Sequence, residues 1–163
     1  MILVTRDDIE RWASSFEAKG ELPHLVARLV YTTTPNNTEI RFPSGSAVFL
    51  SGWDGVVNCK EDTRFIPKGV TCIEIGTDKN PKSKSDKDYK KRKEDSLGFN
   101  QIETTYIFIT PYIWKGKCDW IKDKQALGIW KEVKVYDGID LEQWLEISLP
   151  TSKWFASKIK QTL

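Results

Sequence analysis

The feature that most restricts the fold is an apolar run at residues 105–110, Thr-Tyr-Ile-Phe-Ile-Thr, in which hydrophobic and polar side chains do not alternate. Successive side chains of a strand point to opposite faces, so a strand with this pattern is buried on both faces. Such strands lie in the middle of sheets that carry helices on each side. The run therefore predicts an α/β fold.

Apolar periodicity and turn residues predict the remaining elements. The first 33 residues predict two helices; Thr5 and Asp8 form a capping box for the first, an apolar stripe includes Phe16, and Gly20 ends it. We further predict strands at residues 39–42, 47–50, 54–59, 70–76 and 133–136, helices at residues 85–95 and 117–127, and a helix that opens at Asp137 or Asp140. This order predicts a mixed central sheet flanked by helices on both faces.

Composition narrows the classes of protein and of chemistry. The chain has 163 residues, enough for one domain with its own core. Because His24 is the only histidine, chemistries that need two imidazoles are excluded, such as histidine-rich zinc hydrolases and two-histidine phosphodiesterases. The three cysteines (Cys59, Cys72 and Cys118) match no metal motif and predict reduced thiols. With no apolar run of membrane length and no basic leader, we expect a cytoplasmic protein that does not enter a membrane.

The C-terminal residues suggest a boundary. We expect an α/β domain over residues 1–149 and a C-terminal helix over residues 150–163. Trp154 and Phe155 lie at helical spacing there, and so much aromatic surface at a terminus is unusual for a lone domain. The hypothesis is that this helix leads to further domains of a larger protein. Burial of both aromatic side chains within the chain's own core would count against it.

Positive charge is concentrated in one segment. Residues 79–93 contain eight Lys or Arg and two Asp, and since the whole chain carries +2, the rest carries −4. A basic segment on a mildly acidic domain is typical of an element that binds phosphates. A solvated, lysine-rich helix face is the alternative reading. Tyr89 within the segment would either stack on a base or face the core.

Two acids stand out by their surroundings. Asp54 lies between glycines in Gly52-Trp53-Asp54-Gly55, where the backbone can turn tightly. Glu74 is a lone charge in the apolar strand Val-Thr-Cys-Ile-Glu-Ile-Gly at residues 70–76. A buried carboxylate needs a cation or strong donors, which Arg, Lys or a metal ion can supply. A salt-bridged structural carboxylate is therefore the alternative for Glu74. Two carboxylates on adjacent strands, with the Ile75 carbonyl beside them, suit Mg²⁺ or Mn²⁺.

These motifs resemble a known nuclease superfamily. The order of elements, together with GWDG, IEIGT, a Lys- and Tyr-containing helix, TTYIFITP and VYDGIDLEQWL, is similar to the restriction-endonuclease-like, or PD-(D/E)XK, superfamily. It is similar, more specifically, to nuclease-like domains at the N-terminus of large bacterial proteins, some linked to NTPase modules and anti-phage defence. The resemblance covers residues 5–146 and implies a restriction-endonuclease-like core. It assigns Asp54 and Glu74 as the metal-binding acids, with Glu10, Glu17 or Glu39 as a further ligand.

One position departs from the superfamily pattern. Lysine usually stands two residues after the second acid, and here that position is Gly76. A displaced lysine would come from the following loop or helix, where Lys79, Lys84 and Lys87 are in range, and Lys79 or Lys87 is the preferred candidate. Lys84, Lys90, Lys91 and Arg92 are then expected to bind the nucleic-acid backbone.

The leading hypothesis is a metal-dependent DNA endonuclease effector domain of a bacterial defence protein, acting on double-stranded DNA; a homodimer is one assembly that would suit it. Its partners would include other domains of the host protein. Two alternatives remain. One is a catalytically inactive module of the same fold that binds DNA, and the other is a protein-interaction or sensor domain.

Overall fold

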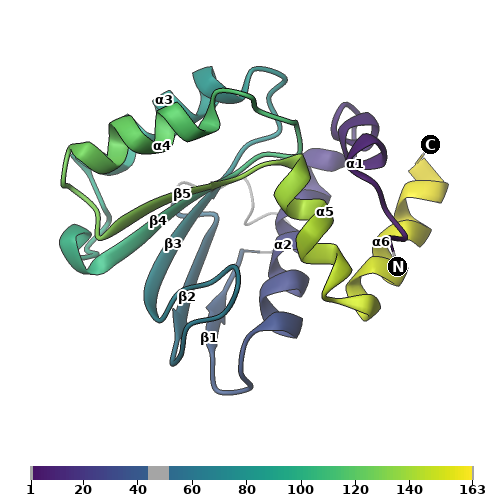
Figure 1. The fold of residues 1–163 in the computed structure, drawn as a ribbon, viewed down its shortest axis with the longest axis horizontal. Coiled ribbons are helices and arrows are strands. Elements are labelled where there is room, and N and C mark those ends of the chain that lie inside the picture. Colours follow the sequence, from purple (N-terminus) through teal and green to yellow (C-terminus); the bar gives the residue numbers. More distant parts are fainter. Residues whose placement is uncertain (1, 44–51, 163) are drawn as a thin grey trace.

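The structure is a computed structural model that describes residues 2–43 and 52–162 (Figure 1). Its elements in chain order are α1 (Arg6–Ala13), α2 (Ala18–Thr33), β1 (Glu39–Arg41), β2 (Gly55–Cys59), β3 (Gly69–Ile75), α3 (Pro81–Glu94), a short 3₁₀ helix (Gln101–Glu103), β4 (Thr104–Ile109), α4 (Lys117–Ala126), β5 (Glu132–Tyr136), α5 (Gly138–Glu146) and α6 (Leu149–Thr162). The strand predicted at residues 47–50 lies outside the described residues.

The strands form one mixed sheet in the order β1-β2-β3-β4-β5. The pairs β1–β2 and β2–β3 are antiparallel, whereas β3–β4 and β4–β5 are parallel. The helix-containing connections α3 and α4 supply the crossovers that parallel strands require. The described residues thus form an α/β fold with a five-stranded mixed sheet and six α-helices packed on it, which confirms the predicted class.

Helices cover both faces of the sheet (Figure 1). On one face, Tyr89 of α3 and Trp120 of α4 share a hydrophobic cluster with alternate residues of the central strands, Cys72, Tyr106 and Phe108. On the other face, α1, α2, α5 and α6 pack against the intervening residues of the same strands. All six residues of β4 are buried, so the reading of the apolar run as a doubly covered strand is confirmed.

The N-terminal helices differ from the predicted pattern. The Thr5 side chain accepts a hydrogen bond from the Asp8 N–H, and the Asp8 side chain accepts one from the Thr5 N–H, as a capping box requires. The helix, however, ends at Ala13. The hydroxyl of Ser14 donates to the carbonyl of Arg11, a local bond that competes with continuation of the helix. Phe16 was expected in the apolar stripe and is instead 95% exposed, because it falls in the turn between α1 and α2.

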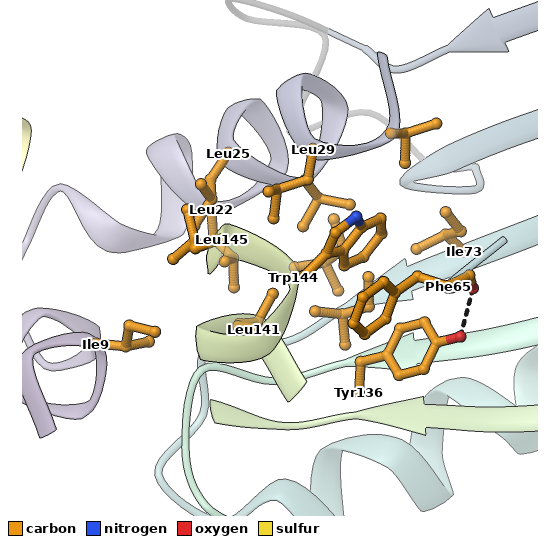
Figure 2. Packing of buried hydrophobic residues seen from close by; sticks show 14 of the residues in the cluster. Ile9, Leu22, Leu25, Leu29, Phe65, Ile73, Tyr136, Leu141, Trp144 and Leu145 are labelled. Atoms are coloured by element: carbon orange, nitrogen blue, oxygen red, sulfur yellow. Dashed lines mark hydrogen bonds between the residues drawn. The ribbon is translucent and has the colours of Figure 1, made fainter. Parts of the chain in front are cut away.

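The C-terminal helices complete the second core cluster. Asp137 caps α5, and Trp144 of that helix is fully buried against Phe65 and Tyr136, whose hydroxyl donates to the Phe65 carbonyl (Figure 2). Phe155 of α6 is buried in the same cluster and meets Trp12 edge to face.

Trp154 of α6 is only partly buried. Its ring lies 4.1 Å from the guanidinium carbon of Arg28. Phe155 is buried in this chain's own core, which counts against the expected outward-facing aromatic surface. Trp154, which is partly exposed, still fits that expectation.

The structure also places the single histidine and the cysteines and shows the character of the helices. His24 is an exposed residue of α2, as predicted for a surface histidine. The three cysteines are free thiols, and Cys59 and Cys72 are buried. Within the described part of the chain, no helix has the length and apolar character needed to cross a membrane.

Candidate functional site

The sheet itself brings Asp54 and Glu74 together. β2 pairs with β3 in a register that sets Gly55 opposite Ile73, so Asp54, one residue before β2, falls beside Glu74. One carboxylate oxygen of Asp54 accepts a hydrogen bond of 2.7 Å from the backbone N–H of Ile75. The N–H and C=O of one strand residue point to the same side. The Ile75 carbonyl therefore points to the side of the strand on which Asp54 lies.

Glu74 is buried against an arginine of α3. The residue is 5% exposed, and one of its carboxylate oxygens accepts a hydrogen bond from Nε of Arg92. Nη2 of Arg92 donates to the Gly52 carbonyl at 2.6 Å, and its guanidinium carbon lies 4.9 Å from the centre of the Trp53 ring. Arg92 thus ties the segment before β2 to both α3 and β3, and it fixes the position of Asp54 next to Glu74.

Burial and the charge of Asp54 disfavour the ionised form of Glu74. They raise the pKa of Glu74 from 4.5 to about 8, although Arg92 acts in the opposite direction. Arg92 therefore does not offset the whole cost of ionising this buried carboxylate next to Asp54. A divalent cation at this point would relieve the remaining repulsion.

A lysine occupies the space next to Gly76. A Cβ atom at Gly76 would lie only 2.6 Å from Cγ of Lys84 and 3.0 Å from the ring of Phe108. The side chain of Lys84, which enters from α3, thus lies beside the position where the superfamily pattern places its lysine. Its ammonium donates to Asp88 at 3.1 Å. Burial lowers the pKa of Lys84, but the nearby carboxylates, chiefly Asp88, outweigh that effect and raise it, so the side chain is charged.

These groups line one cavity of about 210 Å³. Asp54, Glu74 and Ile75 form the part that belongs to the sheet, and Lys84, Asp88, Lys91 and Arg92 line it from α3. Lys19 and Pro23 of α2 complete the lining, although α2 packs on the opposite face of the sheet. The cavity lies where β2 begins and β3 ends, so helices from both faces reach it.

The sequence-predicted residues separate into two groups. The cavity brings together Asp54, Glu74, Ile75, Lys84, Lys91 and Arg92. Lys79 instead lines a different pocket with Glu10 and Tyr112, while Lys87 and Lys90 lie on the exposed surface of α3. Of the two lysines preferred as catalytic, neither lines the cavity, and Lys84 takes that place.

Arg92 requires a correction. It was expected to contact a nucleic-acid backbone, but the residue is 3% exposed and its guanidinium is already bound to Glu74 and Gly52. Tyr89, left open between base stacking and the core, is buried against Tyr106 and Trp120.

The three acids considered as further metal ligands lie elsewhere. Glu10 accepts a hydrogen bond of 3.0 Å from the backbone of Ile113, Glu17 precedes α2, and Glu39 pairs with Asn58 across β1 and β2. Within residues 2–43 and 52–162, no group of three or more His, Cys, Asp or Glu side chains is arranged to hold a metal ion. Two carboxylates and a carbonyl still fit Mg²⁺, which keeps several of its waters and takes one or two carboxylates from the protein.

Sequence reasoning missed three charged residues that line the cavity: Asp88, Asp78 and Lys19. Helical spacing contains a signal for the first, because Lys84, Asp88 and Lys91 follow each other at i, i+4 and i+7 and so share one face of α3. Lys87, three residues after Lys84, is next to this face by spacing, but the structure leaves it exposed and outside the cavity lining. No sequence signal points to Lys19, which reaches the site only through the packing of α2.

No family model matches this chain, and no curated protein or solved structure matches it either. The chemistry of the site therefore has to be inferred from its geometry.

Proposed function

We propose that this chain is a metal-dependent endonuclease domain that hydrolyses phosphodiester bonds of DNA at the cavity formed by Asp54, Glu74 and Lys84. The observation that carries the proposal is the buried Glu74 next to Asp54, a pair of acids that a single arginine does not neutralise. The order α2, β1, β2, β3, α3, β4 also agrees with the restriction-endonuclease-like core that the sequence motifs resemble.

Each residue has a role that follows from its position. The carboxylates of Asp54 and Glu74 and the carbonyl of Ile75 would hold Mg²⁺ or Mn²⁺. Such an ion lowers the pKa of a bound water and offsets charge that develops on the phosphate. Arg92 fixes the orientation of Glu74 through the bond to its carboxylate.

Lys84 supplies a fixed positive charge next to the two acids. Its ammonium is charged and held by Asp88, so it is positioned before substrate arrives. An ammonium at this point would stabilise negative charge on the non-bridging phosphate oxygens in the transition state. Lys84 therefore takes the catalytic role that the sequence assigned to Lys79 or Lys87.

A second candidate is a catalytically inactive module of the same fold that binds DNA. The Glu74–Arg92 pair favours it, because an arginine in contact with the second acid provides a structural reason for that acid. This candidate predicts salt-sensitive DNA binding that does not depend on a divalent metal.

Plasmid cleavage by the purified protein separates the two candidates. We expect cleavage with Mg²⁺ or Mn²⁺, none with EDTA, and none in Asp54→Asn or Glu74→Gln. Lys84→Met should slow cleavage by about 10²- to 10³-fold, the usual cost of one transition-state donor. Glu142→Gln is the matched control, since Glu142 is a buried glutamate that pairs with an arginine, Arg6, away from the cavity. Cleavage that survives in Glu74→Gln, or its absence in the wild type at every metal tested, would contradict the proposal.

The setting of the domain is proposed on the resemblance alone. We propose that it acts as the effector of a larger bacterial defence protein in the cytoplasm, with double-stranded DNA as substrate. A homodimer would allow both strands to be cut. Gel filtration of the purified chain with light scattering tests the dimer directly.

A further inference from the structure

We infer that Lys19 of α2 and Lys91 of α3 form a phosphate-binding rim that holds the DNA backbone over the cavity from two sides. The inference rests on the proposed function for its substrate class, and it adds a contact from α2 that the basic segment does not contain. Both lysines line the cavity, and both are exposed residues.

The other cations of the cavity already have partners. Arg92 is bonded to Glu74, and Lys84 is bonded to Asp88. Lys19 and Lys91, in contrast, form no ion pair and no cation–π contact within the described part of the chain. Their charge is therefore available to an anionic ligand.

Charge in the cavity is separated by depth. Glu74 and Asp88 are buried and Asp54 is partly buried, whereas Lys19 and Lys91 are exposed. A cation is thus favoured inside and an anion at the opening. A phosphodiester that contacts a metal ion with its phosphate oxygens, while its chain continues past the opening, fits both zones.

One exposed acid also borders the opening. Asp78 lies in the loop between β3 and α3 and lines the cavity. Its charge contributes to raising the pKa of Lys84, so Asp78 acts on that lysine. Two exposed lysines and one exposed acid therefore line the opening, so the net charge of these three residues is positive.

The geometry assigns Lys19 and Lys91 to different parts of the substrate. α2 and α3 cover opposite faces of the sheet, and residues of both line the cavity where β2 begins and β3 ends. A backbone that crosses the cavity from one helix to the other would place one phosphate near Lys19 and another near Lys91, with the phosphate between them above Asp54 and Glu74.

The test is DNA binding measured by fluorescence anisotropy, with a labelled duplex and Ca²⁺ in place of Mg²⁺ so that cleavage does not interfere. Affinity is measured over a series of salt concentrations for wild type, Lys19→Gln, Lys91→Gln and the double variant. Lys153→Gln is the matched control, because Lys153 is an exposed helical lysine on α6 that does not line the cavity. Thermal unfolding verifies that each variant is folded.

Each rim substitution should lower the magnitude of the slope of log K against log salt by about 0.9, and the double variant by the sum, because each lysine–phosphate contact with the duplex releases counterions. Lys153→Gln should leave the slope unchanged. The inference is overturned if Lys19→Gln behaves like the control, or if the wild type does not bind DNA. Rim effects without cleavage would support the rim and contradict the nuclease, whereas cleavage with an unaffected Lys19→Gln would do the reverse.

Discussion

Replacing Glu74 with glutamine removes a charge from the site and keeps a side-chain oxygen that can accept the bond from Arg92. In the unfolded chain this glutamate loses its proton near pH 4.5, whereas in the folded protein its pKa is about 8. Between these two values the folded state binds more protons than the unfolded state. The free energy of unfolding of the wild type therefore falls as the pH rises from 4.5 towards 8.

The size of this effect follows from the pKa difference. One pKa unit corresponds to about 1.4 kcal/mol, so the shift from 4.5 to about 8 sets an upper limit of about 5 kcal/mol. Water that enters the cavity screens the charge, so we expect a measured difference of about 2 to 3 kcal/mol. Since the glutamine variant has no such group to titrate, it should be more stable than the wild type above pH 8 and nearly equal to it in acid.

Urea unfolding in EDTA, on both sides of pH 8, measures this difference. Glu142→Gln provides a control of opposite sign. The hydrogen bond from Arg6 lowers the pKa of Glu142, so its charge stabilises the fold at neutral pH and that contribution is lost as the pH falls through the folded pKa. Its glutamine variant should be less stable at neutral pH. If Glu74→Gln were also less stable than the wild type above pH 8, the Glu74–Arg92 pair would be a net stabilising structural bridge, and the reading of Glu74 as a metal ligand would be refuted.

Three further substitutions test other parts of the structure. Gly76→Ala should displace Lys84 and lower the free energy of unfolding by about 1 to 3 kcal/mol, because the new Cβ would lie 2.6 Å from Cγ of Lys84. The cleavage rate and the Tm should both fall, and an unchanged cleavage rate would argue against a catalytic role for Lys84. Asp137→Ala should cost about 2 to 4 kcal/mol in chemical unfolding, because it removes the cap of α5 and leaves the buried N–H of Trp114 without its acceptor at 3.0 Å. Ile107→Ala should cost about 2 to 5 kcal/mol by the same measurement, since the side chain is fully buried in the middle of β4; a loss below 1 kcal/mol would contradict its position in the core.

The sequence predicted those helices and strands well that depend on residues close together in the chain. The unbroken apolar run became β4, and the capping residues Thr5 and Asp137 begin α1 and α5. The pattern failed at Phe16, where the backbone turns out of the helix after Ala13. A side-chain hydrogen bond at Ser14 competes with the helix there, and apolar periodicity does not include such bonds.

For the candidate site too, the sequence identified one part and the tertiary structure the other. The sequence by itself determined that Asp54 and Glu74 are unusual, because a lone acid in an apolar strand and an acid between glycines can be recognised without a structure. Only the tertiary structure decided which cations lie beside them. The choice between Lys84 and Lys87 depends on how α3 is rotated against the sheet, and that of Lys79 on the path of the loop before α3. The burial of Arg92 and the approach of Lys19 depend on how helices from two faces meet at the end of β3. These contacts join residues that are far apart in the chain, and they follow from the packing of whole elements, which no local pattern encodes.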